Sequence, residues 1–156
     1  MQNFKIISRM SFVFTVLLAA LVILSGCAAT INYTYDPTAS FAGLKTYNWA
    51  MTGTVWQNND LVLKNIQYDA DQVLMKKGFT KTTEKPDILI AATCESEYGV
   101  NRYGYEIRIL TLHIQKADSK QMIWPGSATG TTNTDAASGD LKKAVEGILA
   151  NFPPKK

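Results

Sequence analysis

The spacing of hydrophobic and polar residues changes several times along this chain, and each change predicts a different element. Residues 31–35 alternate apolar and polar, which is typical of a half-buried strand, and Asp36-Pro37 ends that strand. A second alternating segment, 44–50, places Tyr47 and Trp49 on one face. Three further strands are predicted later in the chain, over residues 87–94, 105–116 and 121–132.

Two segments have a helical period instead. The first begins at Asn59, where Asn58 or Asn59 is expected to cap it, and Gly78 is expected to end it. The second is predicted to start with Ser138 as its N-cap and to end before Pro153-Pro154. Its apolar stripe consists of Leu141, Ala144, Val145, Ile148 and Leu149.

Two of the predicted strands have patterns that suggest special environments. Segment 87–94 is nearly continuously apolar, as expected for a strand covered on both faces. In segment 105–116 the apolar residues change parity between Ile109 and Leu110. A strand that keeps its core face through this change needs an extra residue, so we expect a β-bulge there.

The resulting order, β-β-α-β-β-β-α, predicts an α+β fold. We expect a largely antiparallel sheet of about five strands, with the two amphipathic helices packed on it. The last two strands are joined by a turn too short for a crossover, so this pair is antiparallel. About 130 residues follow the first 26, which suits a single domain with a core of its own.

The first 26 residues have the layout of a secretory signal. Lys5 and Arg9 precede a short apolar segment, and small residues follow it. The step Leu24-Ser25-Gly26-Cys27 resembles the bacterial lipobox, in which the cysteine carries diacylglycerol and becomes the mature N-terminus. The alternative is an uncleaved membrane anchor with an incidental cysteine, although the apolar segment is shorter than the roughly 20 residues that span a bilayer.

These features divide the chain into a cleaved signal peptide (1–26), a lipidated N-terminus and short tether (27–30), and one periplasmic α+β domain (31–156). Acylated Cys27 makes membrane lipid the first expected partner. Ala28 follows it where an Asp would resemble an inner-membrane retention signal. We therefore expect a palmitate-bearing lipoprotein of the outer membrane that faces the periplasm.

The charge of the domain argues against nucleic acid as a partner. The chain has 16 Lys and Arg against 13 Asp and Glu, but two of the basic residues, Lys5 and Arg9, leave with the signal. The mature protein then has a net charge of about +1 and lacks a basic stripe.

Few residues suggest catalysis. Cys94 is expected to pack as a small buried hydrophobe. His113 is expected to point outward from its strand with Thr111 and Gln115, as an exposed surface residue. Glu95 and Glu97 share a strand face and suit a solvated strand end better than a carboxylate pair. The sequence therefore predicts a protein that is not an enzyme and needs no metal or cofactor.

An aromatic set around one predicted hairpin is the candidate interaction surface. It consists of Tyr98, Arg102, Tyr103 and Tyr105. Tyr and Arg are favoured at recognition surfaces, where they could stack on a glycan or bind a protein. The alternative is that these tyrosines only cover a sheet edge.

Four segments of the chain resemble one family of bacterial lipoproteins, known as domain of unknown function 4136. The segment "DPTASFAGLKTYNW" holds Asp36, Phe41, Lys45, Thr46, Tyr47 and Trp49 at the family's spacings. "MKKGF" before "KPDILI", "DSKQMIWPGSATG" with Asp118, Trp124 and Gly126, and "AVEGILANFPP" also match. Pro125 and the segment "SEYGVNRYGYEIR" depart from the family pattern. The resemblance implies no activity, because none is established for the family.

Two functions are consistent with these observations. The first is a non-catalytic envelope lipoprotein that binds another envelope protein or takes part in envelope assembly. The second is a tethered binder or carrier of a small apolar or glycan ligand, with a pocket near Trp49 or Trp56.

Overall fold

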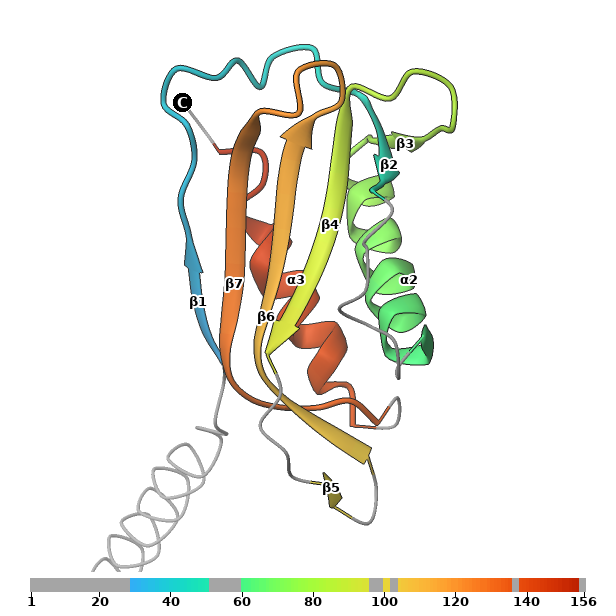
Figure 1. The fold of residues 1–156 in the computed structure, drawn as a ribbon, viewed down its shortest axis with the longest axis vertical. Helices are drawn as coiled ribbons and strands as arrows, with labels where there is room; N and C mark the ends of the chain where they lie inside the picture. The colour runs from blue at the N-terminus through green and yellow to red at the C-terminus, as the bar shows by residue number, and fades with distance from the viewer. Residues whose placement is uncertain (1–28, 51–59, 96–99, 102–103, 136–137, 155–156) are drawn as a thin grey trace, which may run out of the picture.

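The structure, a computed structural model, describes residues 29–50, 60–95, 100–101, 104–135 and 138–154. In this part of the chain, one β-sheet carries two helices on the same face (Figure 1). The elements, in chain order, are β1 (Thr30–Tyr33), β2 (Thr46–Trp49), α2 (Asp60–Lys76), β3 (Thr80–Lys81), β4 (Ile88–Glu95), β5 (Val100–Asn101), β6 (Gly104–Lys116), β7 (Met122–Asn133) and α3 (Asp140–Ala150).

The α+β class and the two helices are confirmed, but the sheet differs in detail from the expectation. Its strand order is β1-β7-β6-β4-β2-β3, and β5 pairs with β6. The pairs formed by β1, β4, β6 and β7 are antiparallel, whereas β2 is parallel to both β3 and β4. The sheet is therefore mixed, because α2 returns the chain to the end of the sheet at which β2 began. The expected count of about five strands did not include β3 and β5. Each of these strands has only two residues, which are too few to show alternation.

The long central strands bury only one face. In β4, Ile88, Ile90 and Ala92 are fully buried, whereas the intervening residues 89, 91 and 93 are half-buried. The expectation that this strand is covered on both faces is therefore wrong. Its outward positions include alanine and threonine, which read as apolar or neutral in the sequence but tolerate partial exposure.

The parity change in β6 coincides with a register shift, as predicted, but the extra residue belongs to the neighbouring strand. Between Ile107 and Ile109, β6 has one residue, whereas β7 has Gly130 and Thr131 opposite it. Gly130 has a φ of +146°, which a residue with a Cβ rarely adopts. A second shift leaves Ile123 of β7 without a partner on β6.

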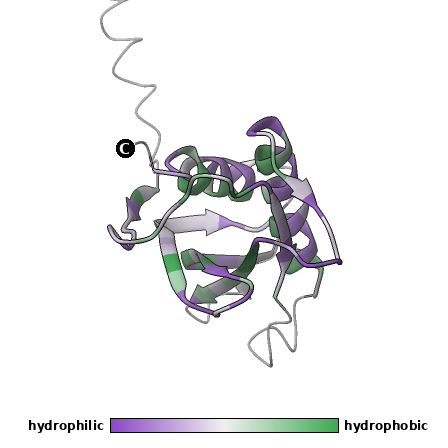
Figure 2. Ribbon diagram, turned by 90° about the horizontal axis from the view of Figure 1, so that it is seen from above, coloured by the Kyte–Doolittle hydropathy of each residue, from purple (hydrophilic) through white to green (hydrophobic). Residues whose placement is uncertain are grey.

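Both helices pack as the sequence pattern predicts. The core face of α2 consists of Val62, Ile66, Ala70 and Leu74, and Gly78 follows the helix with a φ of +85°. All five predicted stripe residues of α3 are buried. The N-cap, however, is Gly139 rather than Ser138, whose hydroxyl instead accepts a hydrogen bond from the Asp140 N–H at 3.1 Å. Figure 2 shows apolar and polar segments alternating along the helical ribbons.

Trp124 is the largest fully buried side chain and joins β7 to the C-terminal end of the chain. Its ring lies across Gly126 of the same strand, so closely that a Cβ at Gly126 would lie 2.1 Å from the ring. The ring also contacts Phe152, at 5.4 Å between ring centroids. Phe152 also contacts Phe41 and Phe79, at 6.2 and 5.6 Å. These rings hold the segment before β2, the end of α2 and the end of α3 against one end of the sheet.

We predict that Gly126→Ala reduces the free energy of unfolding by about 2–3 kcal/mol, because the added methyl group forces the buried Trp124 ring from its position. Urea unfolding of the purified protein, followed by tryptophan fluorescence, measures this change. The neighbouring Ser127→Ala, on the other face of β7, is the matched control and should change stability by less than about 0.5 kcal/mol. Equal stability of Gly126→Ala and the wild type would contradict the assigned role of the glycine.

Candidate functional site

Asp71 of α2 anchors the two strands at one side of the sheet. Its Oδ1 accepts hydrogen bonds from Tyr47 Oη at 2.8 Å and Trp49 Nε1 at 2.9 Å. Its Oδ2 accepts a hydrogen bond from Lys81 Nζ at 2.9 Å. Tyr47 and Trp49 lie two residues apart in β2, so the alternation of the strand directs both toward the helix.

This cluster has a structural role, because it holds β2 against α2. Tyr47 is fully buried, and its burial, followed by its hydrogen bond to Asp71, raises the pKa of the phenol above its ordinary value. The Asp71 carboxylate already accepts three hydrogen bonds, and Trp49 donates its only polar hydrogen to it. The indole N–H of Trp49 is therefore already used within the protein, and it does not support the expected ligand pocket near this residue. Trp56, the other residue proposed for that pocket, lies outside the described residues.

Asp87 fixes the start of β2 to the start of β4. Its Oδ2 accepts hydrogen bonds from the backbone N–H groups of Lys45 and Thr46 and from Thr46 Oγ1, each at 2.8 Å. These bonds, that of Lys45 first, lower the pKa of the Asp87 carboxyl. At the same end of the molecule, Asp36 accepts hydrogen bonds from the Thr38 N–H at 2.8 Å and from Gln121 Nε2 at 2.8 Å. The recurring residues of the "DPTASFAGLKTYNW" segment thus have structural roles.

The described helices leave the other face of the sheet uncovered (Figure 1). We call it the open face. Its central part consists of short, half-buried side chains in register across three strands: Ala91 and Thr93 of β4, Thr111 and His113 of β6, and Pro125 and Ser127 of β7. A surface built of such side chains is flat and only weakly polar, which suits contact with a second broad surface.

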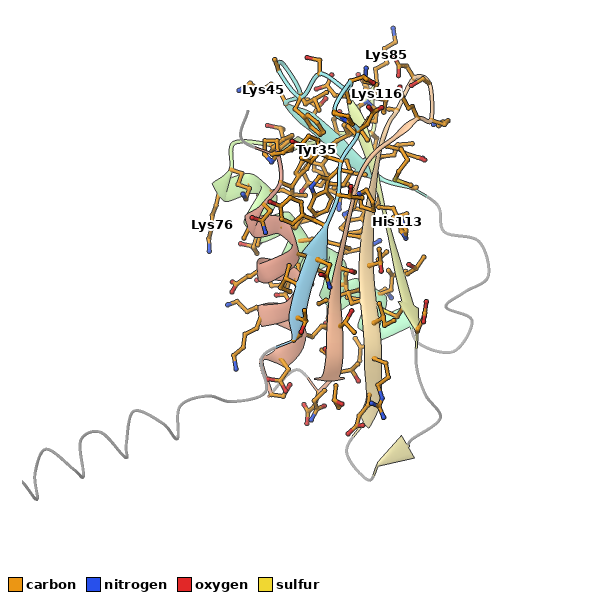
Figure 3. All side chains as sticks on the ribbon, turned by 90° about the vertical axis from the view of Figure 1, so that its left-hand side faces the viewer. Tyr35, Lys45, Lys76, Lys85, His113 and Lys116 are labelled. Atoms are coloured by element: carbon orange, nitrogen blue, oxygen red, sulfur yellow. The ribbon has the colours of Figure 1, made fainter. Side chains whose placement is uncertain are left out.

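His113 lies on this open face, as Figure 3 shows, and points away from the helices as predicted. It is half-buried rather than exposed, because its neighbours in register, Ala91 and Pro125, flank it closely on both sides. Its Nε2 lies 3.0 Å from Thr93 Oγ1, and its burial lowers the pKa of the imidazole. The Thr93 hydroxyl and the His113 imidazole can form one hydrogen bond with each other. The second ring nitrogen of His113 can then bond to a partner.

A shallow depression of about 280 Å³ lies beside His113's strand, where β1 meets β7. Its lining includes Asn32, Thr34, Thr111, Pro125 and Ser127. The Tyr33 ring lies on the other side of the sheet, because Tyr33 is in register with the buried Gly126 and its ring stacks at 6.3 Å on Trp124. Pro125, a departure from the family pattern, thus contributes directly to the open face.

The remaining predicted residues are dispersed. Cys94 faces the core, as expected, and burial raises the pKa of its thiol to about 12, so it is an unreactive packing residue. Glu95 is exposed at the end of β4. Tyr105 lies in β6, where its backbone pairs with Val100 of β5. Outside the described residues lie Cys27, Asn58, Asn59, Glu97, Tyr98, Arg102 and Tyr103.

The described residues form neither a metal centre nor a membrane-spanning helix. No group of three or more His, Cys, Asp and Glu side chains there is arranged to hold a metal ion. Neither of the described helices is long and apolar enough to cross a membrane.

The geometry above defines a small α+β domain with a mixed sheet and helices on one face. The family model described as "Domain of unknown function (DUF4136)" matches residues 31–154, so the chain belongs to this family. No curated protein gives a significant match.

Solved structures share the fold at low sequence identity. A PDZ domain protein from Parabacteroides distasonis matches with a TM-score of 0.62 and 18% identity over 82% of this chain. The match covers 36% of that protein, so this chain corresponds to about a third of its length. The PelC dodecamer from Paraburkholderia phytofirmans matches with a TM-score of 0.57 and 12% identity, over 82% of this chain and 99% of PelC.

We predict that Asp71→Ala lowers the free energy of unfolding by about 2–4 kcal/mol, because it leaves the hydroxyl of Tyr47 and the indole N–H of Trp49 without their acceptor. Lys81→Ala removes only the half-exposed ion pair and should cost less than about 1 kcal/mol. Urea unfolding of both variants distinguishes the two effects. A Lys81→Ala variant as unstable as Asp71→Ala would show that the ion pair, and not the buried hydrogen bonds, holds β2 to α2.

Proposed function

We propose that this protein is a lipid-anchored envelope lipoprotein whose domain acts without catalysis, as a protein-interaction or envelope-assembly module. In this proposal Cys27 carries the lipid, the outer membrane holds the anchor, and the domain faces the periplasm. The partner is a protein of the envelope, and nucleic acid and cofactors have no part in the function.

The open face is the observation that carries this proposal. A sheet face with short, half-buried side chains can be covered by another flat surface at little cost in side-chain entropy. Strand β1 lies at the edge of the sheet and adjoins this face, so its outer side offers backbone groups for pairing. PelC, which shares the fold, is described as a dodecamer, and this supports an assembly role for such a domain.

Binding of a small apolar or glycan ligand is the second candidate. The depression of about 280 Å³ on the open face supports it, because Asn32, Thr111 and Ser127 line it and offer hydrogen-bonding groups to a sugar-like ligand. Saturable quenching of tryptophan fluorescence by lipids or muropeptides would favour this candidate.

We predict that the protein isolated from membranes starts at Cys27 and carries the mass of diacylglycerol and an additional acyl chain. Intact-mass spectrometry measures both the cleavage and the modification. Cys27→Ser is the control and should lack the lipid mass. Wild-type protein with the same mass as its unmodified sequence would contradict the lipoprotein proposal.

We also predict that crosslinking in cells enriches one envelope partner, and that a charge on the open face removes it. Thr111→Arg places a long cation at the centre of this face, among half-buried neighbours. Tyr68→Arg is the matched control, because this residue is 65% exposed on α2, on the helix side of the molecule. The yield of the crosslinked partner should fall at least fivefold in Thr111→Arg and stay unchanged in Tyr68→Arg.

The opposite result has a definite meaning. A partner retained in Thr111→Arg but lost in Tyr68→Arg would place the interaction on the helix layer. The absence of a stable partner in the wild type would overturn the assembly role and leave ligand binding as the proposal to test.

A further inference from the structure

Strand β1 has a free outer edge. It stands at one end of the strand order, where it pairs with β7, and Figure 1 and Figure 3 show no described element on its other side. Figure 3 views the sheet from this side, with β1 in blue at the front. Thr30, Asn32 and Tyr33 are exposed, so both faces of the strand are open to solvent.

The backbone groups of β1 alternate between β7 and this outer side. The N–H groups of Thr34 and Asp36 donate to carbonyl oxygens of β7, each at 3.1 Å, so the ladder continues beyond the four residues of the strand itself. In an antiparallel pair, the residues between such bonded positions direct their N–H and C=O groups away from the neighbouring strand. The outward groups therefore belong to Ile31, Tyr33 and Tyr35.

This edge lacks the devices that usually block the addition of a further strand. Natural edge strands are protected by lysine, by proline, by a bulge or by being very short. Residues 29–35, "ATINYTY", contain no charged residue and no proline, and the segment ends only at Asp36-Pro37. The opposite edge of the described sheet is protected, because β3 has two residues and one of them is Lys81.

Two tyrosines at this edge remain partly exposed. Tyr33 is 48% exposed and Tyr35 is 38% exposed. The Tyr33 ring contacts Trp124 at 6.3 Å, and the Tyr35 ring contacts Phe41 at 6.1 Å. These contacts hold each ring in place while leaving part of it uncovered. A strand added at this edge would cover the rings, and cross-strand aromatic pairs stabilise an antiparallel ladder.

We propose that two copies of this protein pair through β1, antiparallel and about a two-fold axis at Tyr33. In this arrangement Tyr33 lies opposite its own equivalent, and Ile31 lies opposite Tyr35 of the second copy. The outward groups of all three residues then bond to the second copy, and the two sheets become one. The inference rests on the proposed assembly function, for which it names a second copy as a partner.

A second copy fits this edge because the edge is complementary to itself. Antiparallel pairing brings each outward N–H to an outward C=O of the same segment. It brings no like charges together, because Asp36, the first charged residue of the segment, lies opposite Thr30. The protected β3 edge adds no further strand, so the assembly closes at two copies and does not grow into a filament.

The same register makes Asn32 and Thr34 the contact between the copies on the open face. Asn32 of one copy lies opposite Thr34 of the other, at a pair of positions where the facing Cβ atoms are about 4.5–5.5 Å apart. Both residues are exposed, and both line the depression beside β7. Substitutions at these two positions therefore change the contact between copies without altering the core.

Sedimentation equilibrium of the full protein, purified from membranes in a density-matched detergent, tests the proposal. Asn32→Lys combined with Thr34→Lys places lysine opposite lysine at both symmetry-related positions. Asn32→Lys combined with Thr34→Glu is the matched variant, because it places lysine opposite glutamate at the same positions. Urea unfolding followed by tryptophan fluorescence verifies that both variants are folded.

We expect the mass of the wild-type protein to approach twice that of the monomer between about 1 and 200 μM, a range that covers weak pairing through a small interface. The variant with two lysines should dissociate about fivefold more readily or more, because like charges directly opposite each other destabilise the ladder. The variant with lysine and glutamate should associate at least as tightly as the wild type.

The outcomes separate this proposal from the proposed function. A wild-type protein that stays monomeric would overturn the pairing. If it still crosslinks an envelope partner in cells, the proposed function stands and the β1 edge is open to a strand of that partner. Equal association of the two variants would overturn the proposed register and place the contact elsewhere. A dimer that depends on these two positions, without any other crosslinked protein in cells, would support the pairing and overturn the separate envelope partner.

Discussion

The contact of Trp124 with the backbone of Gly126 determines how the rest of the domain packs. Regular alternation would direct only one of two consecutive residues inward, but the register shift at Ile123 lets both Ile123 and Trp124 face the core. The ring then lies flat along β7 because position 126 has no Cβ. Phe152 packs against this ring at a steep angle and thereby fixes the C-terminal segment. The buried Trp124 N–H has no hydrogen-bond partner among the described residues, a cost that the large buried ring area offsets.

Helices on a single face leave the domain with two unlike surfaces. The helix side is held by apolar packing and by the buried hydrogen bonds of Asp71, which join α2 to the short strand β2. The other side is held only by strand pairing, so its side chains are free to contact another molecule. The motif residues follow this asymmetry, since Tyr47 and Trp49 lie on the helix side and Asp36 lies in a turn.

Periodicity predicted the long elements because each has enough residues to repeat its pattern: α2, α3 and the strands 88–95, 104–116 and 122–133 all lie near their expected positions. The two-residue strands β3 and β5 have no such repeat. The parallel pairing of β2 depends on where α2 returns the chain, which local pattern does not specify. Asp71 and Asp87 were missed for a similar reason, since the groups they bind lie 10 to 42 residues away in sequence. An aspartate within a mostly apolar segment was the only available signal.

The start of β1 depends on the same kind of close approach as the Trp124 ring. Ala29 packs against the core, and its Cα would lie only 3.3 Å from a Cβ on Gly130, so the missing side chain lets β1 pair with β7 from its first residue. Gly130 also belongs to the two residues of β7 that lie opposite one residue of β6. One glycine therefore serves both the register shift of the central pair and the attachment of the edge strand, and the open face extends from β4 through β6 and β7 to β1.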